Sequence, residues 1–435
     1  MSSTVELPAQ QAVSQRRDDW RDGLLMVALW VWYALLSFPI ATVDAFEIVS
    51  NQVLIYQGAG LLLFVAAAMI LAPMRAAEAL GRLTPAQLAI VVIILASLAL
   101  QFHGPETAVL EGTAYTLALL LVAACLSGLW TMPPDALANC LGGIGIVLVA
   151  FGVFSIAVFG WPQGRMVGGI HPNAFGGIML AAFVTSQFRR GYPMMAVKAV
   201  SLVLAAAVSS RFAVIGCILA YLIFELSARP FGSRTALMGV AIVTCLILVA
   251  TVFKDVLALD DPSRNLDSGF TGRDDQWARA LEAISEAPFG LGFKRPPVED
   301  AGHNGYLRWL LEFGVLGGSL AIAATLAITL SAIVEIFRMP DTVPDLRRLG
   351  AARAAGLVAV TFASFFQPQL FNLGDVHGVT VILMLFSLRI GSRSSGEGPF
   401  VPAARRPSQT IKDTTSPSAQ DNIIKLSHVP IRQPC

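Results

Sequence analysis

The sequence has little charge and a large excess of apolar residues. Only 14% of its 435 residues are charged and 55% are hydrophobic, whereas about 25% are charged in an ordinary globular protein. With a mean hydropathy of +0.67, the chain lacks the polar surface that one soluble domain needs. The 37 Gly and 24 Pro are spread among apolar stretches, which excludes collagen-like and disordered chains. Composition therefore predicts a polytopic membrane protein.

The low net charge and the lack of metal-binding motifs exclude several classes of function. The net charge is +1, so the chain has no basic face for nucleic acid. The five cysteines have no Cys-x-x-Cys spacing, and four lie inside apolar runs, which argues against a disulfide framework or a zinc site. The five histidines and the scattered acids show no metal-binding spacing either, so we expect no metal and no other cofactor. The first apolar run is too long for a cleavable signal and is interpreted as a spanning helix.

The apolar runs predict an all-α fold. A spanning helix needs about 20 mostly apolar residues, which divides this chain into about twelve spans. The sixth, seventh, eighth and twelfth are short. The spans are predicted to begin near Leu24, Gln52, Ala86, Leu110, Ala138, Asn173, Pro193, Phe212, Thr235, Tyr306, Gly350 and Val376.

The positions of Lys and Arg predict the orientation. With a cytoplasmic N-terminus, the outer segments 44–51, 102–109 and 367–375 hold no basic residue, and most arginines fall in inner loops, as the positive-inside rule requires. Both termini are then cytoplasmic, and 254–305 is one long outer loop. We divide the chain into an N-terminal tail (1–23), a transmembrane domain (24–390) and a disordered cytoplasmic tail (391–435).

Polar residues gather on the predicted outer face. Arg165 precedes a glycine-rich turn that contains His171 and Asn173, and Asn173 is the expected N-cap of the next helix. Arg211 begins the eighth span. Charged groups at a membrane edge are costly and therefore indicate function, although a single arginine there can simply contact lipid phosphate.

The long loop contains a predicted amphipathic helix. Thr271 is its expected cap, and Arg273, Trp277, Leu281 and Ile284 lie on one helical face. A helix of this kind is typical of a membrane interface. Its cation at the wet end can bind a phosphate of either a lipid or a substrate.

Where the loop meets the tenth span, the sequence has His303 followed by Asn304. A neutral histidine can take a proton from a hydroxyl, because its pKa lies near ambient pH, but it can equally be a helix cap. Arg308 and Glu312 are four residues apart on the same helix and are interpreted as an ion pair.

Together these residues indicate a reaction. Arginine binds phosphate through two parallel charge-assisted hydrogen bonds, and arginines can stabilise the charge of a departing diphosphate. Three arginines and a histidine on one membrane face therefore favour metal-independent glycosyl transfer from a polyprenyl diphosphate sugar.

The order of the motifs resembles the bacterial O-antigen ligase and polysaccharide polymerase superfamily, whose members are inner-membrane glycosyltransferases of the C type. The part of the chain that resembles this superfamily covers about residues 160–335. It rests on Arg165, the turn at 171–173, Ser210 with Arg211, Gly272 with Arg273 and Trp277, and the segments 288–292 and 303–317.

The resemblance implies roles for individual residues. Arg165, Arg211 and Arg273 would hold undecaprenyl diphosphate, and His303 would be the general base. Asn304, His171 and Asn173 would orient the base or the acceptor. Inversion at the anomeric carbon would follow from direct displacement, without a covalent intermediate. The implied partners are the lipid-linked glycan, the bilayer, an acceptor glycan or lipid A–core, and other polysaccharide export proteins.

Three functions remain open at this point. A polymerase joins the chain to another lipid-linked repeat unit, and it is favoured because the turn around His303 is similar to those of exopolysaccharide polymerases. An O-antigen ligase moves the finished glycan to lipid A–core. A transporter or flippase fits twelve spans, but it would show repeated halves, which the sequence lacks. A membrane scaffold would leave the outer arginines and His303 unexplained.

Overall fold

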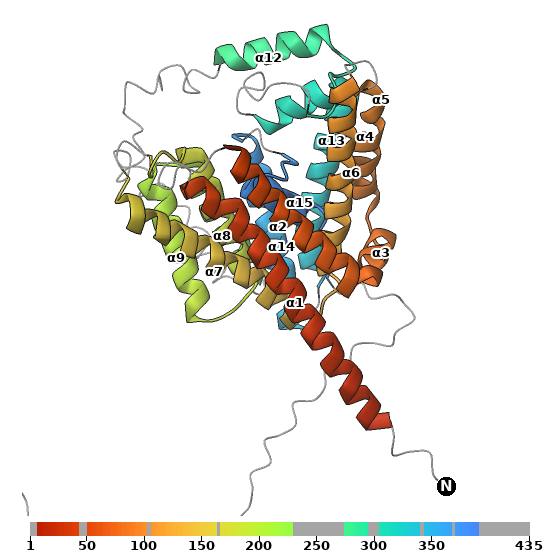
Figure 1. Cartoon of the computed structure of the whole chain (residues 1–435), viewed down its shortest axis with the longest axis vertical. Helices are drawn as coiled ribbons and strands as arrows, with labels where there is room; N and C mark the ends of the chain where they lie inside the picture. The colour runs from red at the N-terminus through yellow and green to blue at the C-terminus, as the bar shows by residue number, and fades with distance from the viewer. Residues whose placement is uncertain are drawn as a thin grey trace, which may run out of the picture. The chain divides into compact units, whose positions relative to one another are not determined.

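The computed structural model describes residues 7–42, 50–101, 106–162, 166–228, 274–294, 304–339, 343–367 and 370–390. These residues form an all-helical bundle (Figure 1), which confirms the predicted fold class. The helices are α1 (Leu7–Thr42), α2 (Ser50–Leu71), α3 (Pro73–Gly81), α4 (Pro85–Ala96), α5 (Leu98–Gln101), α6 (Glu106–Leu129), α7 (Pro134–Phe159), α8 (Pro172–Ser186), α9 (Tyr192–Ala207), α10 (Arg211–Ala228), α12 (Asp274–Glu286), α13 (Gly305–Arg338), α14 (Pro344–Ser364) and α15 (Val376–Leu385).

Six of these helices are long and apolar enough to cross a membrane, and the protein is a multi-pass membrane protein. They are α1 (over Asp19–Phe38), α2, α6 (over Val109–Leu129), α7, α10 and α13. The pair α3 and α4, bent by 105°, raises the number to seven if it forms one broken span. The predicted count of twelve is not reached among the described residues, and the ninth predicted span, from Thr235, lies outside them.

The remaining predicted spans differ from a simple crossing helix in two ways. Helices α8, α9 and α15 are apolar but have only 15, 16 and 10 residues, as expected for three of the short spans. Helix α14 has 21 residues but begins before the predicted Gly350, and its first half carries Asp345, Arg347, Arg348 and Arg353. The helix therefore extends into a charged segment, which a search for apolar spans leaves out.

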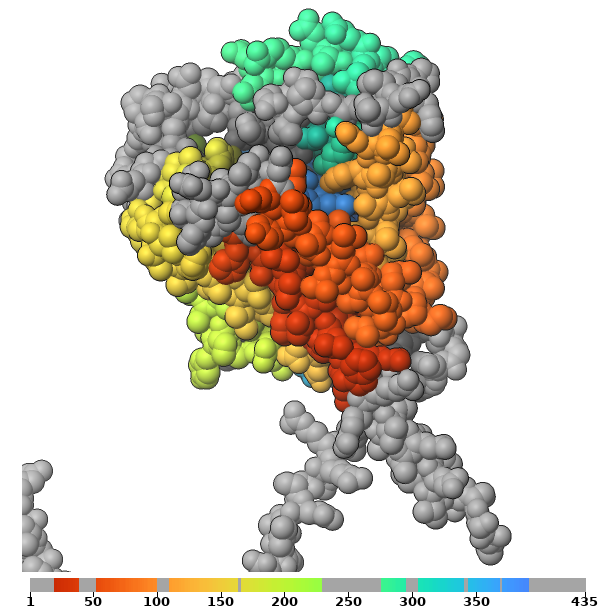
Figure 2. All heavy atoms as spheres, viewed as in Figure 1, coloured from red at the N-terminus to blue at the C-terminus, as the bar shows by residue number. Residues whose placement is uncertain are grey.

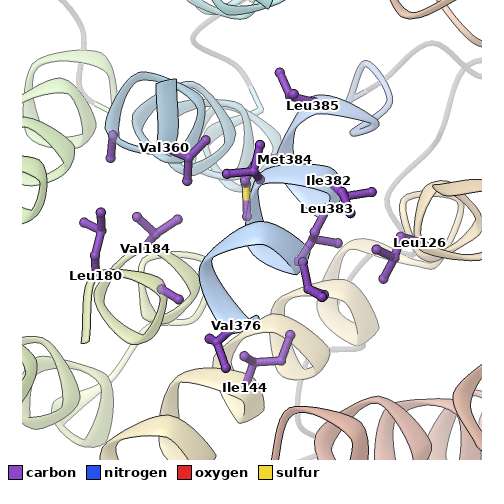
Figure 3. Packing of buried hydrophobic residues seen from close by; sticks show 14 of the residues in the cluster. Leu126, Ile144, Leu180, Val184, Val360, Val376, Ile382, Leu383, Met384 and Leu385 are labelled. Carbon is purple, nitrogen blue, oxygen red and sulfur yellow. The ribbon is translucent and has the colours of Figure 1, made fainter. Parts of the chain in front are cut away.

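Helices α14 and α15 form the centre of the bundle. Every residue of α15 is buried, as expected for a helix that is apolar on all sides. Figure 3 shows its side chains among residues of α6, α7, α8 and α14, such as Leu126, Ile144, Val184 and Val360. Helix α14 packs along α10, and its Gly356 faces Val184 of α8 and Met384 of α15, because small residues let apolar helices approach closely.

A partly buried ion pair joins one end of this central group. Arg353 of α14 contacts Glu335 of α13 at 2.7 Å and donates to the Ser387 hydroxyl, beyond α15, at 2.7 Å. The backbone N–H of Ile390 also donates to Glu335. The last turns of α13 and α15 therefore lie together, and their first turns lie at the opposite end of the bundle.

Candidate functional site

The first turns of α8, α10 and α15 meet at that opposite end of the bundle. A Cβ built on Gly176 of α8 would lie 2.0 Å from the Ser210 hydroxyl oxygen, and one on Gly177 would lie 3.3 Å from Cβ of His377. The rings of Phe212 and His377 also approach, with centroids 6.4 Å apart. Two adjacent glycines of α8 thus allow α10 and α15 to pack closely against it.

Helix α10 begins at Arg211, one residue before the predicted start near Phe212. The preceding turn is tight: Ser209 has a φ of 51° and the Ser210 N–H donates to the carbonyl of Ala205 at 3.1 Å. Ser210 is fully buried, and among the described residues its hydroxyl has no hydrogen-bond partner. The start of α10, and with it the backbone position of Arg211, is therefore set by contact with α8.

Helix α8 begins differently from the prediction. His171, not Asn173, is the N-cap: its Nδ1 accepts a hydrogen bond from the N–H of Asn173 at 3.2 Å. The prediction of Asn173 as cap was wrong because Pro172 occupies the first helical position, where its fixed φ and missing N–H suit helix initiation. His171 is exposed and Asn173 half-buried.

Asn304 is the N-cap of α13. Its side-chain oxygen accepts hydrogen bonds from the N–H groups of Tyr306 at 2.9 Å and Leu307 at 3.2 Å, and the residue is buried. The oxygen is committed to the helix, so any orienting hydrogen bond from Asn304 must come from its NH2 group. The preceding His303 lies outside the described residues.

Helix α12 confirms the predicted amphipathic helix in the long loop. Trp277 meets the ring of Phe365 edge-on at 5.4 Å, and Ala280 and Ile284 pack against Leu311 of α13. The predicted face was wrong in one member, because Leu281 is 55% exposed and lies at the edge of the packed stripe. Thr271 and Arg273 lie just before the described part of this helix. Figure 2 shows α12 in green on the surface of the molecule.

A backbone clasp connects α12 to α13. Helix α13 is broken at Gly314, which has φ 74° and ψ 175°. The break leaves backbone carbonyl groups of α13 without a partner in the helix, and the loop after α12 binds two of them. The Leu291 N–H donates to the Leu311 carbonyl at 2.8 Å, and the Gly292 N–H donates to the Glu312 carbonyl at 3.0 Å. The N–H of Val315 donates back to the Pro288 carbonyl at 2.8 Å. The first part of α13 and the loop after α12 are therefore held as one unit.

A charged cluster lies beside this clasp. The predicted ion pair is present, with Arg308 Nε 2.8 Å from Glu312 Oε1, and both side chains are buried. Sequence reasoning missed Lys294, whose N–H donates to the same Glu312 oxygen at 3.2 Å and whose Nζ lies 5.4 Å from the centre of the Tyr115 ring. Asp375, the N-cap of α15, is near enough to act on Lys294 electrostatically. No spacing in the sequence relates Lys294 or Asp375 to the Arg308–Glu312 pair, so only the tertiary structure reveals that they are neighbours.

Burial shifts the pKa of two members of the cluster. It lowers the pKa of Lys294 to about 8, although the carboxylate of Glu312 opposes the shift. It raises the pKa of Asp375 to about 6, although backbone hydrogen bonds from Gly378 and His377 lower it. Both shifts disfavour the charged form, as expected where water is largely excluded.

The predicted site residues fall into two groups. Arg211, His171, Asn173 and Asn304 lie at the starts of helices, whereas Arg165, Arg273 and His303 lie outside the described residues. The convergence of three arginines on His303 thus stays a prediction. In the described part of the chain, no group of three His, Cys, Asp or Glu side chains is placed to hold a metal ion.

Comparison with known proteins identifies one domain. Residues 178–322 match the family model Wzy_C, described as O-antigen ligase. The matched segment runs from α8 into α13 and includes Arg211, Arg273, His303 and Asn304, whereas Arg165, His171 and Asn173 precede it. No curated protein matches the chain. Residues 178–322, within the membrane helix bundle, are thus similar to the O-antigen ligase family, as the motifs predicted.

Proposed function

We propose that this protein transfers a glycan from undecaprenyl diphosphate to an acceptor hydroxyl at the periplasmic face, as a polymerase of a surface polysaccharide. The observation that carries the proposal is the O-antigen ligase match over 178–322, which contains Arg211, Arg273 and His303. The packed starts of α8, α10 and α15 and the clasp between α12 and α13 support it, because they build a rigid frame beside the segments that carry those residues.

The proposed mechanism is a direct displacement. The acceptor oxygen attacks the anomeric carbon, and the bond from that carbon to the diphosphate oxygen breaks as the new glycosidic bond forms. His303 takes the proton of the acceptor hydroxyl. The electron pair of the broken bond leaves with the diphosphate, whose growing charge is stabilised by Arg165, Arg211 and Arg273. Attack opposite the leaving group inverts the configuration, and the step uses no metal ion.

The remaining proposed contacts are orienting ones. The NH2 group of Asn304 would hold the ring of His303 or the acceptor, since its side-chain oxygen caps α13. His171 and Asn173 share the start of α8 and would contact the acceptor there. Polymer growth and ligation to lipid A–core differ only in the acceptor that occupies this position.

The test is the lipid-linked glycan profile of a strain that lacks the protein, resolved by chain length. A polymerase predicts that single repeat units accumulate on the carrier. Long chains retained on the carrier would instead show that the protein is a ligase. A normal profile would point to transport or another role.

Complementation with variants tests the base. His303→Ala is expected to reduce transfer roughly 100-fold or more, the usual contribution of general base catalysis, and to leave the amount of folded protein unchanged. The control is Arg190→Gln, which removes an exposed ion pair with Asp345 on α14 and should restore the profile fully. Full activity of His303→Ala would remove the general base from the mechanism.

A further inference from the structure

Arg308 is a buried guanidinium with unused donors. Its side chain is 6% exposed, and its Nε donates to Glu312 at 2.8 Å. Among the described residues, neither of its two terminal NH2 groups has a hydrogen-bond acceptor. A charged group that is buried with most of its donors unpaired is costly. The cost is offset if an anionic ligand binds the two NH2 groups, whose planar geometry matches a carboxylate or phosphate.

Lys294 supplies a second cation beside Arg308. Its Nζ makes one long hydrogen bond, 3.5 Å to the carbonyl of Leu370, and otherwise lies over the rings of Tyr115 and Phe293 at 5.4 and 5.6 Å. An ammonium group has three donors, so this one is incompletely satisfied. Lys294 also has a φ of 62°, an unfavourable backbone conformation for a lysine that persists only where the surroundings impose it.

Both acids of the cluster accept hydrogen bonds, although Oε2 of Glu312 has no partner among the described residues. Glu312 Oε1 accepts from Arg308 Nε and from the Lys294 N–H, which orients both residues. Asp375 Oδ2 accepts from the N–H of Gly378 and caps α15. Glu312 therefore fixes the positions of both basic residues, and the terminal NH2 groups of Arg308 and the ammonium group of Lys294 remain for a ligand.

The cluster lies close to the predicted catalytic turn. The N–H of Arg308 donates to the carbonyl of Asn304 at 3.1 Å, so Arg308 follows the cap of α13 by one helical turn. His303 is adjacent to Asn304 in the chain. A glycan whose hydroxyl reaches His303 thus has its neighbouring sugar within a few ångströms of Arg308, since one helical turn spans about 5.4 Å.

We propose that Arg308 and Lys294 bind an acidic substituent of the glycan substrate, a carboxylate or phosphate oxygen separate from the donor diphosphate. The proposal rests on the proposed function for the identity of the ligand as a glycan. It makes the repeat unit of the polysaccharide an acidic one and makes the Arg308–Lys294 pair a determinant of specificity.

Direct binding to the purified full-length protein tests this subsite. The probes are a tetrasaccharide of galacturonic acid, a neutral tetrasaccharide of galactose and inorganic phosphate, measured by isothermal titration calorimetry. Wild-type protein should bind the acidic tetrasaccharide at least tenfold more tightly than the neutral one. Competition by inorganic phosphate at a comparable concentration assigns the natural substituent to phosphate, and weak competition assigns it to carboxylate.

Two variants and a matched control assign the effect to the pair. Lys294→Gln keeps the backbone hydrogen bond to Glu312. Arg308→Gln combined with Glu312→Gln removes both members of the buried ion pair together, so neither member is left without the other. Each should lose at least tenfold in affinity for the acidic probe and little for the neutral one. The control combines Arg82→Gln with Glu78→Gln, which removes an ion pair of the same spacing on α3, and should bind as wild type.

The outcomes separate this proposal from the proposed function. Equal binding of the acidic and neutral probes by wild-type protein would overturn the subsite, whatever the lipid-linked profile shows. Unchanged acidic binding by Lys294→Gln would overturn it as well, even if the double variant fails to fold. Selective acidic binding together with a normal lipid-linked profile would instead retain the subsite and reject the transfer reaction.

Discussion

Gly290 and Gly314 meet backbone to backbone. A Cβ on Gly290 would lie 2.4 Å from the amide nitrogen of Gly314, and one on Gly314 would lie 2.4 Å from the carbonyl carbon of Phe289. Both glycines have positive φ, 92° and 74°. The close approach lets the loop after α12 reach the backbone groups that the break in α13 leaves free.

Alanine at either glycine should open this clasp. A positive φ costs an L-residue roughly 1–2 kcal/mol. The new methyl group would also overlap backbone atoms, which cannot move aside as the end of a flexible side chain can. Gly314→Ala should therefore lower the melting temperature and speed hydrogen exchange at Leu291, Gly292 and Val315.

The matched control for the clasp is Gly58→Ala in α2, where a Cβ would meet nothing within 4 Å. It should leave stability unchanged or slightly higher, because alanine favours the helix. Wild-type exchange rates in Gly314→Ala would show that the clasp does not hold the loop.

Two adjacent glycines of α8 give a second comparison. Gly176→Ala should destabilise the protein by about 1–3 kcal/mol through overpacking, because the methyl group would overlap the Ser210 side chain. It should also reduce transfer, since Arg211 follows the displaced turn.

The control is Gly177→Ala, where a Cβ would lie 3.3 Å from its nearest atom, and it should have the smaller effect. Adding Ser210→Gly to Gly176→Ala should restore stability. Equal losses in both glycine variants would contradict this packing account.

Tyr115 ties α6 to the segment before α15. Its hydroxyl donates to the Phe371 carbonyl at 3.0 Å and accepts from the Leu373 N–H at 2.8 Å. Tyr115→Phe should lower the free energy of unfolding by about 1–3 kcal/mol, because two buried backbone groups lose their partner. Chemical denaturation can measure the change, with the exposed Tyr192→Phe as control. A loss no larger than that of the control would mean that water replaces the hydroxyl.

Arg273 tests the proposed diphosphate contact. Arg273→Lys should reduce the transfer rate about tenfold or more, because a lysine cannot replace a bidentate guanidinium. The control is Arg279→Lys, an exposed arginine farther along α12, which should transfer normally. Comparable rates in the two variants would reduce Arg273 to an interfacial anchor.

Lys294 predicts a specific dependence of stability on pH. Its pKa is about 8 in the folded protein and 10.5 in its ordinary state. Between these values the unfolded chain binds more protons, so this group makes stability rise as pH increases from about 8 to 10.5. The charged or titratable neighbours that face it are Glu312, Arg308, Asp375 and Tyr115.

Lys294→Gln should remove that rise. Melting temperatures of wild type and variant, measured from pH 7 to 10.5, should converge toward the alkaline end if the variant is more stable at neutral pH. Parallel curves over the whole range would show that Lys294 titrates normally.

Much of the local structure was predictable. The starts of α10 and α13, the amphipathic α12 and the ion pair of Arg308 with Glu312 all depend on spacing within one helix or turn. One error arose where two local preferences competed, and the other arose from packing between helices. Pro172 shifted the cap of α8 to His171, and packing against α13 favoured Ala280 over Leu281 on α12.

The sequence by itself determined a helical membrane protein and a segment similar to the O-antigen ligase family, and it supplied the residues to which we assign diphosphate binding and proton transfer. Those conclusions depend on composition, helical period and motif order, which are local properties. Only the tertiary structure placed Gly290 on Gly314 and Lys294 beside Arg308 and Tyr115. These contacts join residues far apart in the chain, and no periodicity encodes them. They arise because the break in α13 leaves backbone groups that another segment must satisfy.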